Sequence, residues 1–292
     1  MDDGKLKQSL DFKNHSLSYL LKKIKICHIP CNLSLFQPES FLSCSIFNDR
    51  MYELFISLCM CFHNSMNKKI KDLAARYGRK SDVIEMAREI LEEQYHVNAF
   101  HYPFCPIITG GEEIEAFQWG LIPFWTRTEE DAKEIRRMTL NAKAETLFQK
   151  PSFRGPAKTK RCLIPSTGYF EWRHEEKAKL PYYLFLKEEE IFSIAGVYEE
   201  WEDKKTGQQL FTFSMITTGA NSLTAYIHNT KKRMPAILLK EEEENWLDPE
   251  LSEKEALALL QPIPADTMEA YRIKNDFLRK PSTDPSVLEK AS

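Results

Sequence analysis

The stretch "IFSIAGVYEEWEDKKTGQQLFTFSMITT" (residues 191–218) decides the fold. It contains two runs rich in β-branched and aromatic residues, and the polar segment "DKKTGQ" (203–208) separates them. Such runs favour the pleated, half-buried surface of a strand, and a short connection that contains glycine is typical of an antiparallel hairpin. We therefore expect a β-hairpin over this stretch.

Similar apolar runs on either side of this hairpin predict further strands, and a period of three to four residues predicts helices. The expected strands are 113–123, 160–172, 181–188 and 234–239, the expected helices are 66–78, 82–95, 129–138 and 251–262, and 101–111 is expected to be a loop. Because helices and strands do not alternate regularly, a parallel doubly wound sheet is disfavoured. The order predicts an α+β fold with a mostly antiparallel, barrel-like β core and flanking helices.

Composition limits the class of protein. The 292 residues are 42% hydrophobic and carry a formal net charge of -3. This is enough apolar material for one large domain or two small ones, and the charge excludes a generally basic nucleic-acid binder. No run reaches the ~18 apolar residues of a membrane-spanning helix. We expect a cytoplasmic protein without a membrane partner.

The seven cysteines are unevenly placed along the chain. Four of them precede Met60, and the others are Cys61, Cys105 and Cys162. Three cysteines over residues 61–292 make no disulfide framework. The segment "CHIPC" (27–31) resembles half of a zinc site, but no second ligand pair follows at a suitable spacing. We therefore expect no metal site and no cofactor.

Residues 1–59 differ from the rest of the chain in their composition and in their hydrophobic pattern. They contain one glycine and no sustained helical or alternating period. The segment is either a disordered or loosely helical extension or upstream sequence translated in error, and the second interpretation is slightly favoured. We expect one catalytic domain over residues 60–280 and a polar, frayed tail over residues 281–292.

Four short segments carry residues that are able to do chemistry. They are "MCFHNS" (60–65), "LNAKAET" (140–146), "STGYFEWR" (166–173) and "AYIHNTKKRMPAIL" (225–238), which contain Cys61, Asn141, Glu171 and His228. Each alone is weak evidence, because a lone cysteine or histidine is more often packed in a core than catalytic. Glu171 is the most informative, since the aromatic residues around it would make the burial of an unpaired carboxylate costly.

Taken in this order, the segments resemble the SRAP family, the SOS response-associated peptidases that crosslink to abasic sites in DNA. The match runs from Met60 to about Asp276 and combines a Met-Cys start, Asn-Ala-(Arg/Lys)-x-Glu-Thr, Gly-Tyr-(Phe/Tyr)-Glu-Trp and a His that precedes Arg-Met-Pro-x-Ile-Leu. The resemblance implies the family's α+β fold and single-stranded DNA with abasic sites as the partner. It also implies the catalytic residues, which are Cys61, Asn141, Glu171 and His228.

The resemblance gives the Met60–Cys61 pair a chemical meaning. In the family the initiator methionine is removed, and the cysteine amine, with an ordinary pKa of about 7.7–8.0, attacks the ring-opened aldehyde of the abasic sugar. The thiol then closes a thiazolidine ring. An internal cysteine cannot react in this way because its nitrogen is an amide, so the reaction requires removal of everything through Met60.

The other family residues take the roles that this chemistry requires. Glu171 would take a proton from the amine, His228 would shuttle protons, and Asn141 would hold the sugar hydroxyl or the developing oxyanion. The same groups would assist hydrolysis of the peptide bond that precedes Cys61, with the thiol as nucleophile.

Basic charge is concentrated around the proposed site. Eleven Lys/Arg and six acidic residues lie between Trp119 and Arg173, a difference of +5 in a chain that is negative overall. Interleaved aromatic side chains would stack on bases of single-stranded DNA, or alternatively belong to the core. The expected DNA contacts are Lys143, Arg154 and Arg233 for phosphates, His63 where the family usually has arginine, and Trp125 and Phe153 for bases.

Two other classes of protein share parts of this pattern. A cysteine or N-terminal-nucleophile amidohydrolase that acts on a small molecule would use Cys61 and His228 without DNA. A non-enzymatic single-stranded DNA-binding module would need neither residue. Formation of a covalent adduct with an abasic oligonucleotide distinguishes a member of the SRAP family from both of these classes. If the chain is such a member, we expect it to be a monomer.

Overall fold

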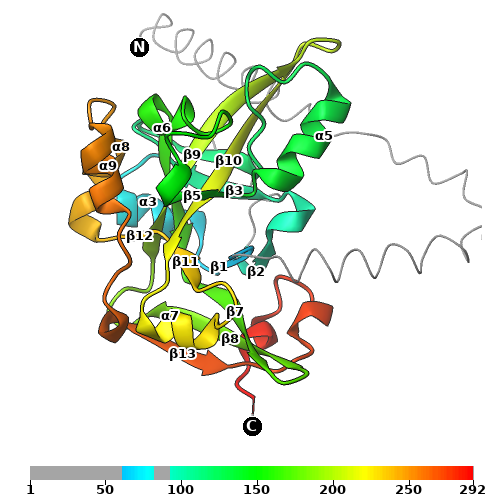
Figure 1. The fold of residues 1–292 in the computed structure, drawn as a ribbon, viewed down its shortest axis with the longest axis vertical. Helices are drawn as coiled ribbons and strands as arrows, with labels where there is room; N and C mark the ends of the chain where they lie inside the picture. The colour runs from blue at the N-terminus through cyan, green and yellow to red at the C-terminus, as the bar shows by residue number, and fades with distance from the viewer. Residues whose placement is uncertain (1–60, 82–92, 292) are drawn as a thin grey trace, which may run out of the picture. The chain divides into compact units, whose positions relative to one another are not determined.

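The computed structural model describes residues 61–81 and 93–291 (Figure 1). The chain divides into two units, Met1–Met60 and Cys61–Ser292. The first unit lies outside the described residues, so the fold given below is that of the second. The division falls between Met60 and Cys61, the pair at which the family pattern in the sequence begins.

A closed barrel forms the centre of the second unit. Its neighbouring strands are β10 (Gln208–Gly219), β4 (Ile114–Trp119), β3 (Phe104–Ile108), β6 (Arg161–Ser166) and β9 (Phe192–Asp203), and β9 pairs with β10 to close the ring. Only the β4–β10 pairing in this ring is parallel. The hairpin expected from the sequence is β9–β10, with Asp203 opposite Gln208, and it is the long yellow-green pair in Figure 1.

Three short strands extend the barrel near the end of β10. β5 (Asn141–Lys143) runs parallel to β10, β11 (Arg233–Pro235) runs antiparallel to it, and β12 (Ile237–Leu238) pairs with β9. Thr217 of β10 lies opposite Lys143 on one side and Pro235 on the other. The register therefore brings the segment after Asn141 close to the segment after His228.

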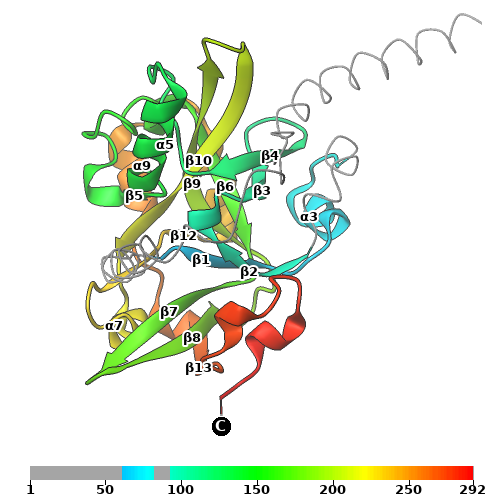
Figure 2. The same cartoon turned by 90° about the vertical axis from the view of Figure 1, so that its right-hand side faces the viewer.

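A second sheet contains strands from both ends of the described chain. Its order is β13 (Met268–Arg272), β8 (Ala178–Leu186), β7 (Gly168–Glu175), β1 (His63–Met66) and β2 (Gln94–Asn98), and every pairing is antiparallel. Figure 2 shows β1 and β2 between the barrel strands and the β7–β8 pair. The two sheets together confirm the predicted α+β fold with a mostly antiparallel, barrel-like core.

Short helices flank the strands. The α-helices are α3 (Ile70–Tyr77), α5 (Glu129–Met138), α6 (Pro156–Thr159), α7 (Ser222–Ile227), α8 (Glu243–Leu247) and α9 (Glu253–Leu259). Single 3₁₀ turns are η3 (Ala99–His101), η4 (Ala144–Thr146), η5 (Lys240–Glu242), η6 (Ala265–Thr267), η7 (Phe277–Arg279) and η8 (Pro285–Leu288). Within the part of the chain that the structure describes, none of the helices has both the length and the apolar character needed to cross a membrane.

Local sequence sets the ends of these helices. Gly78 takes φ = +60° at the end of α3, a conformation that glycine adopts without a Cβ penalty. The Thr128 side chain accepts the N–H of Asp131 at the start of α5, and Ser252 with Glu255 forms a capping box on α9. Helix starts therefore follow from the sequence at α5 and α9.

The following sequence predictions are wrong in detail. Residues 101–111, expected to be a loop, contain the strand β3. Pro106 lies within this strand, and a proline in an apolar run argues against a strand when only the sequence is considered. The helix expected over 82–95 runs too far, because its last residues belong to β2, and residues 82–92 lie outside the described residues. The tail after Lys280 is not frayed, because Val287 is buried and the Tyr271 hydroxyl donates to the Leu288 carbonyl.

Candidate active site

The structure brings Cys61, Asn141, Glu171 and His228 together, although Cys61 is 80 residues from Asn141 and 110 from Glu171. Asn141 opens β5, Glu171 lies within β7, and His228 directly follows α7. Cys61 precedes β1, whose pairing with β7 places the residues before Asn64 beside the middle of β7. Strand register, rather than local sequence, therefore assembles the site.

Both sides of the Cys61 backbone are held by side chains of the site. Its nitrogen donates a hydrogen bond to Glu171 Oε1 at 3.1 Å, and its carbonyl accepts one from Asn141 Nδ2 at 3.0 Å. The residue is 3% exposed and has φ = +27°. A positive φ at a residue with a Cβ is strained by about 1–3 kcal/mol, so the N–Cα torsion of Cys61 is held in a strained conformation.

Glu171 joins Cys61 to His228. Its second carboxylate oxygen, Oε2, lies 3.4 Å from His228 Nδ1, and the same nitrogen lies 3.0 Å from the carbonyl oxygen of Arg233. A carbonyl only accepts hydrogen bonds, so Nδ1 carries a proton and Nε2 is the nitrogen with a lone pair when the ring is neutral. This pattern resembles the base-and-orienter arrangement of nucleophilic catalysis.

Burial shifts the acid–base properties of the pair. Burial raises the pKa of the Cys61 thiol well above its usual value, and the charge of Glu171 and a hydrogen bond to it raise that pKa further. Burial also raises the pKa of Glu171, against the lowering effects of His228 and Cys61. The thiol is therefore protonated at neutral pH, and Glu171 takes up a proton more readily than an exposed glutamate does.

Sequence reasoning missed Tyr169 as a member of the site. Its buried hydroxyl pairs with Thr224 Oγ1 at 3.0 Å, and burial raises the pKa of Tyr169, with the charges of Cys61 and Glu171 adding to that rise. Tyr169 and Glu171 are two residues apart on β7 and so lie on one face of the sheet. This two-residue spacing in "GYFEW" was the signal that could have identified it.

Two of the expected phosphate contacts lie beside the four residues. Lys143 is exposed at the end of β5. Arg233 binds both carboxylate oxygens of Glu145, and its Nη2 also donates to the Thr217 carbonyl at 2.7 Å. Its charge offsets part of the rise in the pKa of the Cys61 thiol. Both cations therefore lie close to the site, and Arg233 is already paired with an acid.

His63 does not supply the positive charge that an arginine would supply. Its Nδ1 lies 2.7 Å from His96 Nε2, the two rings are stacked, and the ring of Trp172 meets His63 edge-on. Burial lowers the pKa of His63 well below its ordinary value, and the neighbouring His96 and His101 lower it further. A neutral imidazole makes a poor phosphate contact, so we do not include His63 among the proposed DNA contacts.

The remaining expected DNA contacts differ in exposure. Trp125 is 48% exposed, and Arg154 is exposed. Phe153 is 7% exposed and belongs to a core cluster with Leu147 and Trp246. A ring that is packed on its faces by core side chains cannot stack on a base, so the structure places Phe153 in the core rather than on a DNA face.

Two exposed aromatic residues were not singled out from the sequence. Phe124 is 65% exposed next to Trp125, and Tyr226 is 57% exposed on α7, two residues before His228. The guanidinium of Arg173 lies 3.8 Å from the centre of the Tyr226 ring. Large aromatic groups exposed to water often mark a binding surface, and unpaired bases stack on such rings.

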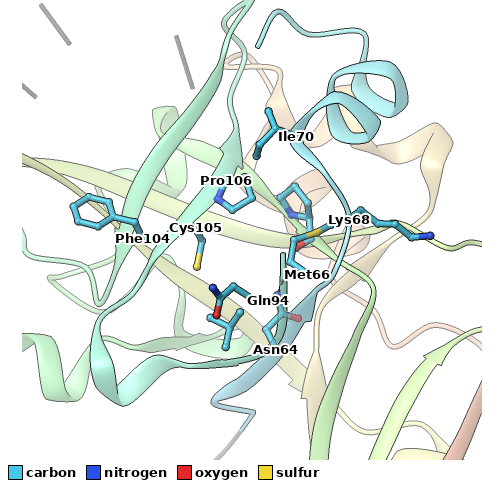
Figure 3. A pocket seen from close by; sticks show the side chains of 10 residues that line it. Asn64, Met66, Lys68, Ile70, Gln94, Phe104, Cys105 and Pro106 are labelled. Carbon is cyan, nitrogen blue, oxygen red and sulfur yellow. Dashed lines mark hydrogen bonds between the residues drawn. The ribbon is translucent and has the colours of Figure 1, made fainter. Parts of the chain in front are cut away.

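One hollow in the second unit is unrelated to these residues. Asn64, Met66, Lys68, Cys105 and Pro106 are among its lining residues, with Cys105 sulfur and Gln94 visible in Figure 3. It encloses about 20 Å³, which is room for roughly one water molecule. It contains none of the four site residues, so it is not a substrate pocket for them.

The donor atoms of Cys61, Glu171 and His228 lie within 4.8 Å of one another, so these are the residues of the site that are able to hold a metal ion. The described cysteines, Cys61, Cys105 and Cys162, are all free thiols. The group of three has the composition of a nucleophile, a base and an acid-base histidine as well as that of a metal site.

Comparison with known proteins identifies a family that shares this sequence. The family model described as SOS response associated peptidase (SRAP) matches residues 60–279. The abasic site processing protein YoqW of Bacillus subtilis is 38% identical over 223 residues, which cover 73% of this chain and 96% of YoqW. The abasic site processing protein YoaM of Bacillus subtilis is 40% identical over 160 residues, which cover 54% of this chain and 67% of YoaM.

Solved structures show the same fold. A protein from Bacteroides thetaiotaomicron superposes with a TM-score of 0.79 at 60% identity, covering 80% of this chain and 100% of that protein. A protein from Bordetella bronchiseptica has a TM-score of 0.63 at 22% identity over 73% of this chain, which shows the shared fold alone. The matched family model spans most of the chain, and the matched residues include the four that the structure brings together. The chain therefore belongs to the SOS response associated peptidase (SRAP) family.

Proposed function

We propose that this protein processes abasic sites in DNA and does so by forming a covalent bond between the DNA and Cys61. The observation that carries the proposal is the nitrogen of Cys61, which lies 3.1 Å from the buried carboxylate of Glu171. Similarity to YoqW and YoaM, both named abasic site processing proteins, supports abasic DNA as the substrate. The family description, SOS response associated peptidase, supports a role in the response to DNA damage.

The proposed reaction starts at the aldehyde of the ring-opened abasic sugar. The free amine of Cys61 attacks the aldehyde carbon, and the resulting carbinolamine loses one water to give an imine. The Cys61 sulfur then adds to the imine carbon, the C=N electron pair moves to nitrogen, and nitrogen takes up the thiol proton. The product is a five-membered thiazolidine, and one water is released in total.

The neighbouring side chains suit the proton transfers in this sequence. Glu171 touches the nitrogen and accepts its proton, because burial raises the pKa of this carboxyl. His228 has its Nδ1–H fixed on the Arg233 carbonyl, which leaves Nε2 to exchange protons during dehydration. Asn141 Nδ2 holds the Cys61 carbonyl and so fixes the nucleophile against Glu171.

Residues 1–60 must be removed before this chemistry starts, because a peptide nitrogen does not form an imine. We propose that the same groups perform this cleavage in cis. The thiol attacks the Met60 carbonyl carbon, the C–N bond breaks with a proton passing to the Cys61 nitrogen, and water hydrolyses the thioester. The positive φ of Cys61 supports this step, since cleavage abolishes the strained torsion.

The proposed DNA surface combines cations with exposed aromatic rings. Lys143, Arg154 and Arg233 would contact phosphates, while Trp125 and Phe124 would stack on bases. Stacking on exposed rings needs unpaired bases, which favours single-stranded DNA. All four site residues come from one chain, so the proposed active form is a monomer.

One assay tests this function against both alternatives. The chain is produced with Cys61 as its first residue, the N-terminus is verified by intact mass, and the protein is incubated with a single-stranded oligonucleotide that contains one abasic site. We expect an adduct that survives heating in denaturant. The Cys61→Ser variant keeps the amine but closes only a labile oxazolidine, so we expect its adduct to be lost on heating.

A matched control separates the amine from the thiol. A glycine inserted ahead of Cys61 leaves the thiol in place and moves the amine to another residue, so it should abolish the heat-stable adduct. A small-molecule hydrolase would form no adduct with the oligonucleotide. A simple binding module would bind equally well after Cys61→Ala and would also form none, and either result would overturn the proposal.

A further inference from the structure

The buried group of Cys61, Glu171 and His228 has the composition of a zinc site. One donor atom from each residue lies within 4.8 Å of the others, and each residue is 3% exposed. Zinc takes sulfur, imidazole nitrogen and carboxylate oxygen as ligands and favours four of them in a tetrahedron. Three of the four donors are therefore present in the chain that retains its N-terminal residues.

The fourth donor appears when Cys61 becomes the first residue. Its nitrogen is 3.1 Å from Glu171 Oε1 and has no available lone pair while it is a peptide nitrogen. As a free amine it gains a lone pair, and the amine and thiolate of one cysteine bind a metal together in a five-membered chelate ring. Removal of the preceding residues thus converts three donors into four.

We propose that the chain with Cys61 as its N-terminus binds one Zn²⁺ through the Cys61 amine and thiolate, Glu171 and His228, and that the bound ion blocks crosslinking to abasic DNA. The second half of this proposal rests on the proposed function. The ion is an inhibitor of the site here, and it takes no part in the reaction with DNA.

Charge and distance support the assignment. The thiolate and the carboxylate together carry two negative charges, which balance Zn²⁺ in a buried site where an unbalanced charge is costly. Bonds of about 2.0–2.3 Å in a tetrahedron put ligand atoms roughly 3.3–3.8 Å apart. The present atoms lie within 4.8 Å of one another, so side-chain rotation has to shorten the widest gap by about an ångström.

His228 faces the group through Nδ1, which lies 3.4 Å from Glu171 Oε2 and 3.0 Å from the Arg233 carbonyl oxygen. Zinc binds Nδ1 once the ring takes the tautomer that carries its proton on Nε2. On binding, the thiol releases its proton to solvent, as coordinating thiols do.

The bound ion would occupy the protein groups that the crosslinking reaction uses. The amine lone pair that attacks the aldehyde and the sulfur lone pair that closes the ring would both be held by zinc. Glu171 would have lost the carboxylate oxygen that accepts the proton. Crosslinking would therefore require the ion to dissociate, and a chelator that removes the ion would restore crosslinking.

Metal binding is measured without DNA. Protein of residues 61–292, a unit of its own in the structure, is titrated under reducing conditions with Co²⁺, whose thiolate charge-transfer absorption reports a bond to sulfur. Zn²⁺ is then added to displace it. We expect one equivalent of each ion, with Zn²⁺ binding at least about 10-fold more weakly after His228→Ala and after insertion of a glycine ahead of Cys61. Cys105→Ser, at a buried thiol outside the group, should bind as the parent protein does.

Crosslinking in the presence of a chelator keeps the two proposals separate. Adduct formation in chelator, with loss of the adduct on adding one equivalent of Zn²⁺, supports the inhibitory site. Adduct formation that Zn²⁺ leaves unchanged overturns it, as does equal Zn²⁺ affinity after the glycine insertion. Metal binding without any adduct in chelator refutes the proposed function and with it the inhibitory role, while the binding site itself stands.

Discussion

Replacement of Glu171 by glutamine should move two activities of Cys61 in opposite directions. Glutamine keeps the length of the side chain and an oxygen that accepts the hydrogen bond from the Cys61 N–H, which Glu171 Oε1 now accepts at 3.1 Å. It removes the negative charge and the proton acceptor. Burial raises the pKa of the Cys61 thiol most, and the charge of Glu171 and a hydrogen bond between Glu171 and the thiol raise it further. Glu171→Gln therefore lowers that pKa and increases the thiolate fraction at neutral pH.

The size of the loss in crosslinking follows from the role of the carboxylate. A positioned general base contributes about 10²–10⁴-fold to a rate, and 10²-fold is about 2.7 kcal/mol of barrier. We expect the crosslinking rate of Glu171→Gln to fall by at least about 10²-fold. Over the same pH range, alkylation of Cys61 by iodoacetamide should become faster, because the thiolate is the reactive form.

Single-turnover crosslinking and alkylation followed by intact mass measure both effects on one preparation. Glu175→Gln is the matched control, because Glu175 lies on the same strand, is exposed and pairs with Arg173. The control should change neither rate. Crosslinking at the parental rate in Glu171→Gln would refute the role of Glu171 as proton acceptor, and slower alkylation would refute its effect on the thiol.

Three further predictions concern the DNA surface and the core. Glu145→Gln releases Arg233 from its ion pair and should strengthen binding to single-stranded DNA up to about 5-fold by fluorescence anisotropy; weaker binding would mean that Glu145 positions Arg233. Trp125→Ala should weaken the same binding by about 1–3 kcal/mol, and unchanged affinity would remove Trp125 from the surface. Phe153→Ala should lower stability to urea by about 3–5 kcal/mol, and an unaltered midpoint would contradict its core position.

The residues that the sequence identifies well are those whose identity is tied to chemistry. Cys61, Asn141, Glu171 and His228 stand in short motifs, and the structure brings all four together. The β9–β10 hairpin is also predictable, because its alternating runs and its turn are local features. Neither prediction requires knowledge of which distant segments touch.

The predictions that are missed depend on contacts across the fold. His63 pairs with His96 because β1 and β2 lie side by side, a register that no local pattern reveals. Phe153 carries the same ring whether it faces a base or the core, and only packing against Leu147 and its neighbours decides between them. The ion pair of Glu145 with Arg233 likewise follows from β5 and β11 sharing β10.

The proposed mechanism depends most directly on which atoms of the protein are bonded to the DNA. Digestion of the purified adduct and tandem mass spectrometry will locate the sugar remnant on the peptide. We predict that it is attached to the α-nitrogen and the sulfur of Cys61, in a peptide that begins at Cys61. A remnant on a lysine side chain, or on a chain that still carries Met60 ahead of Cys61, would contradict the mechanism.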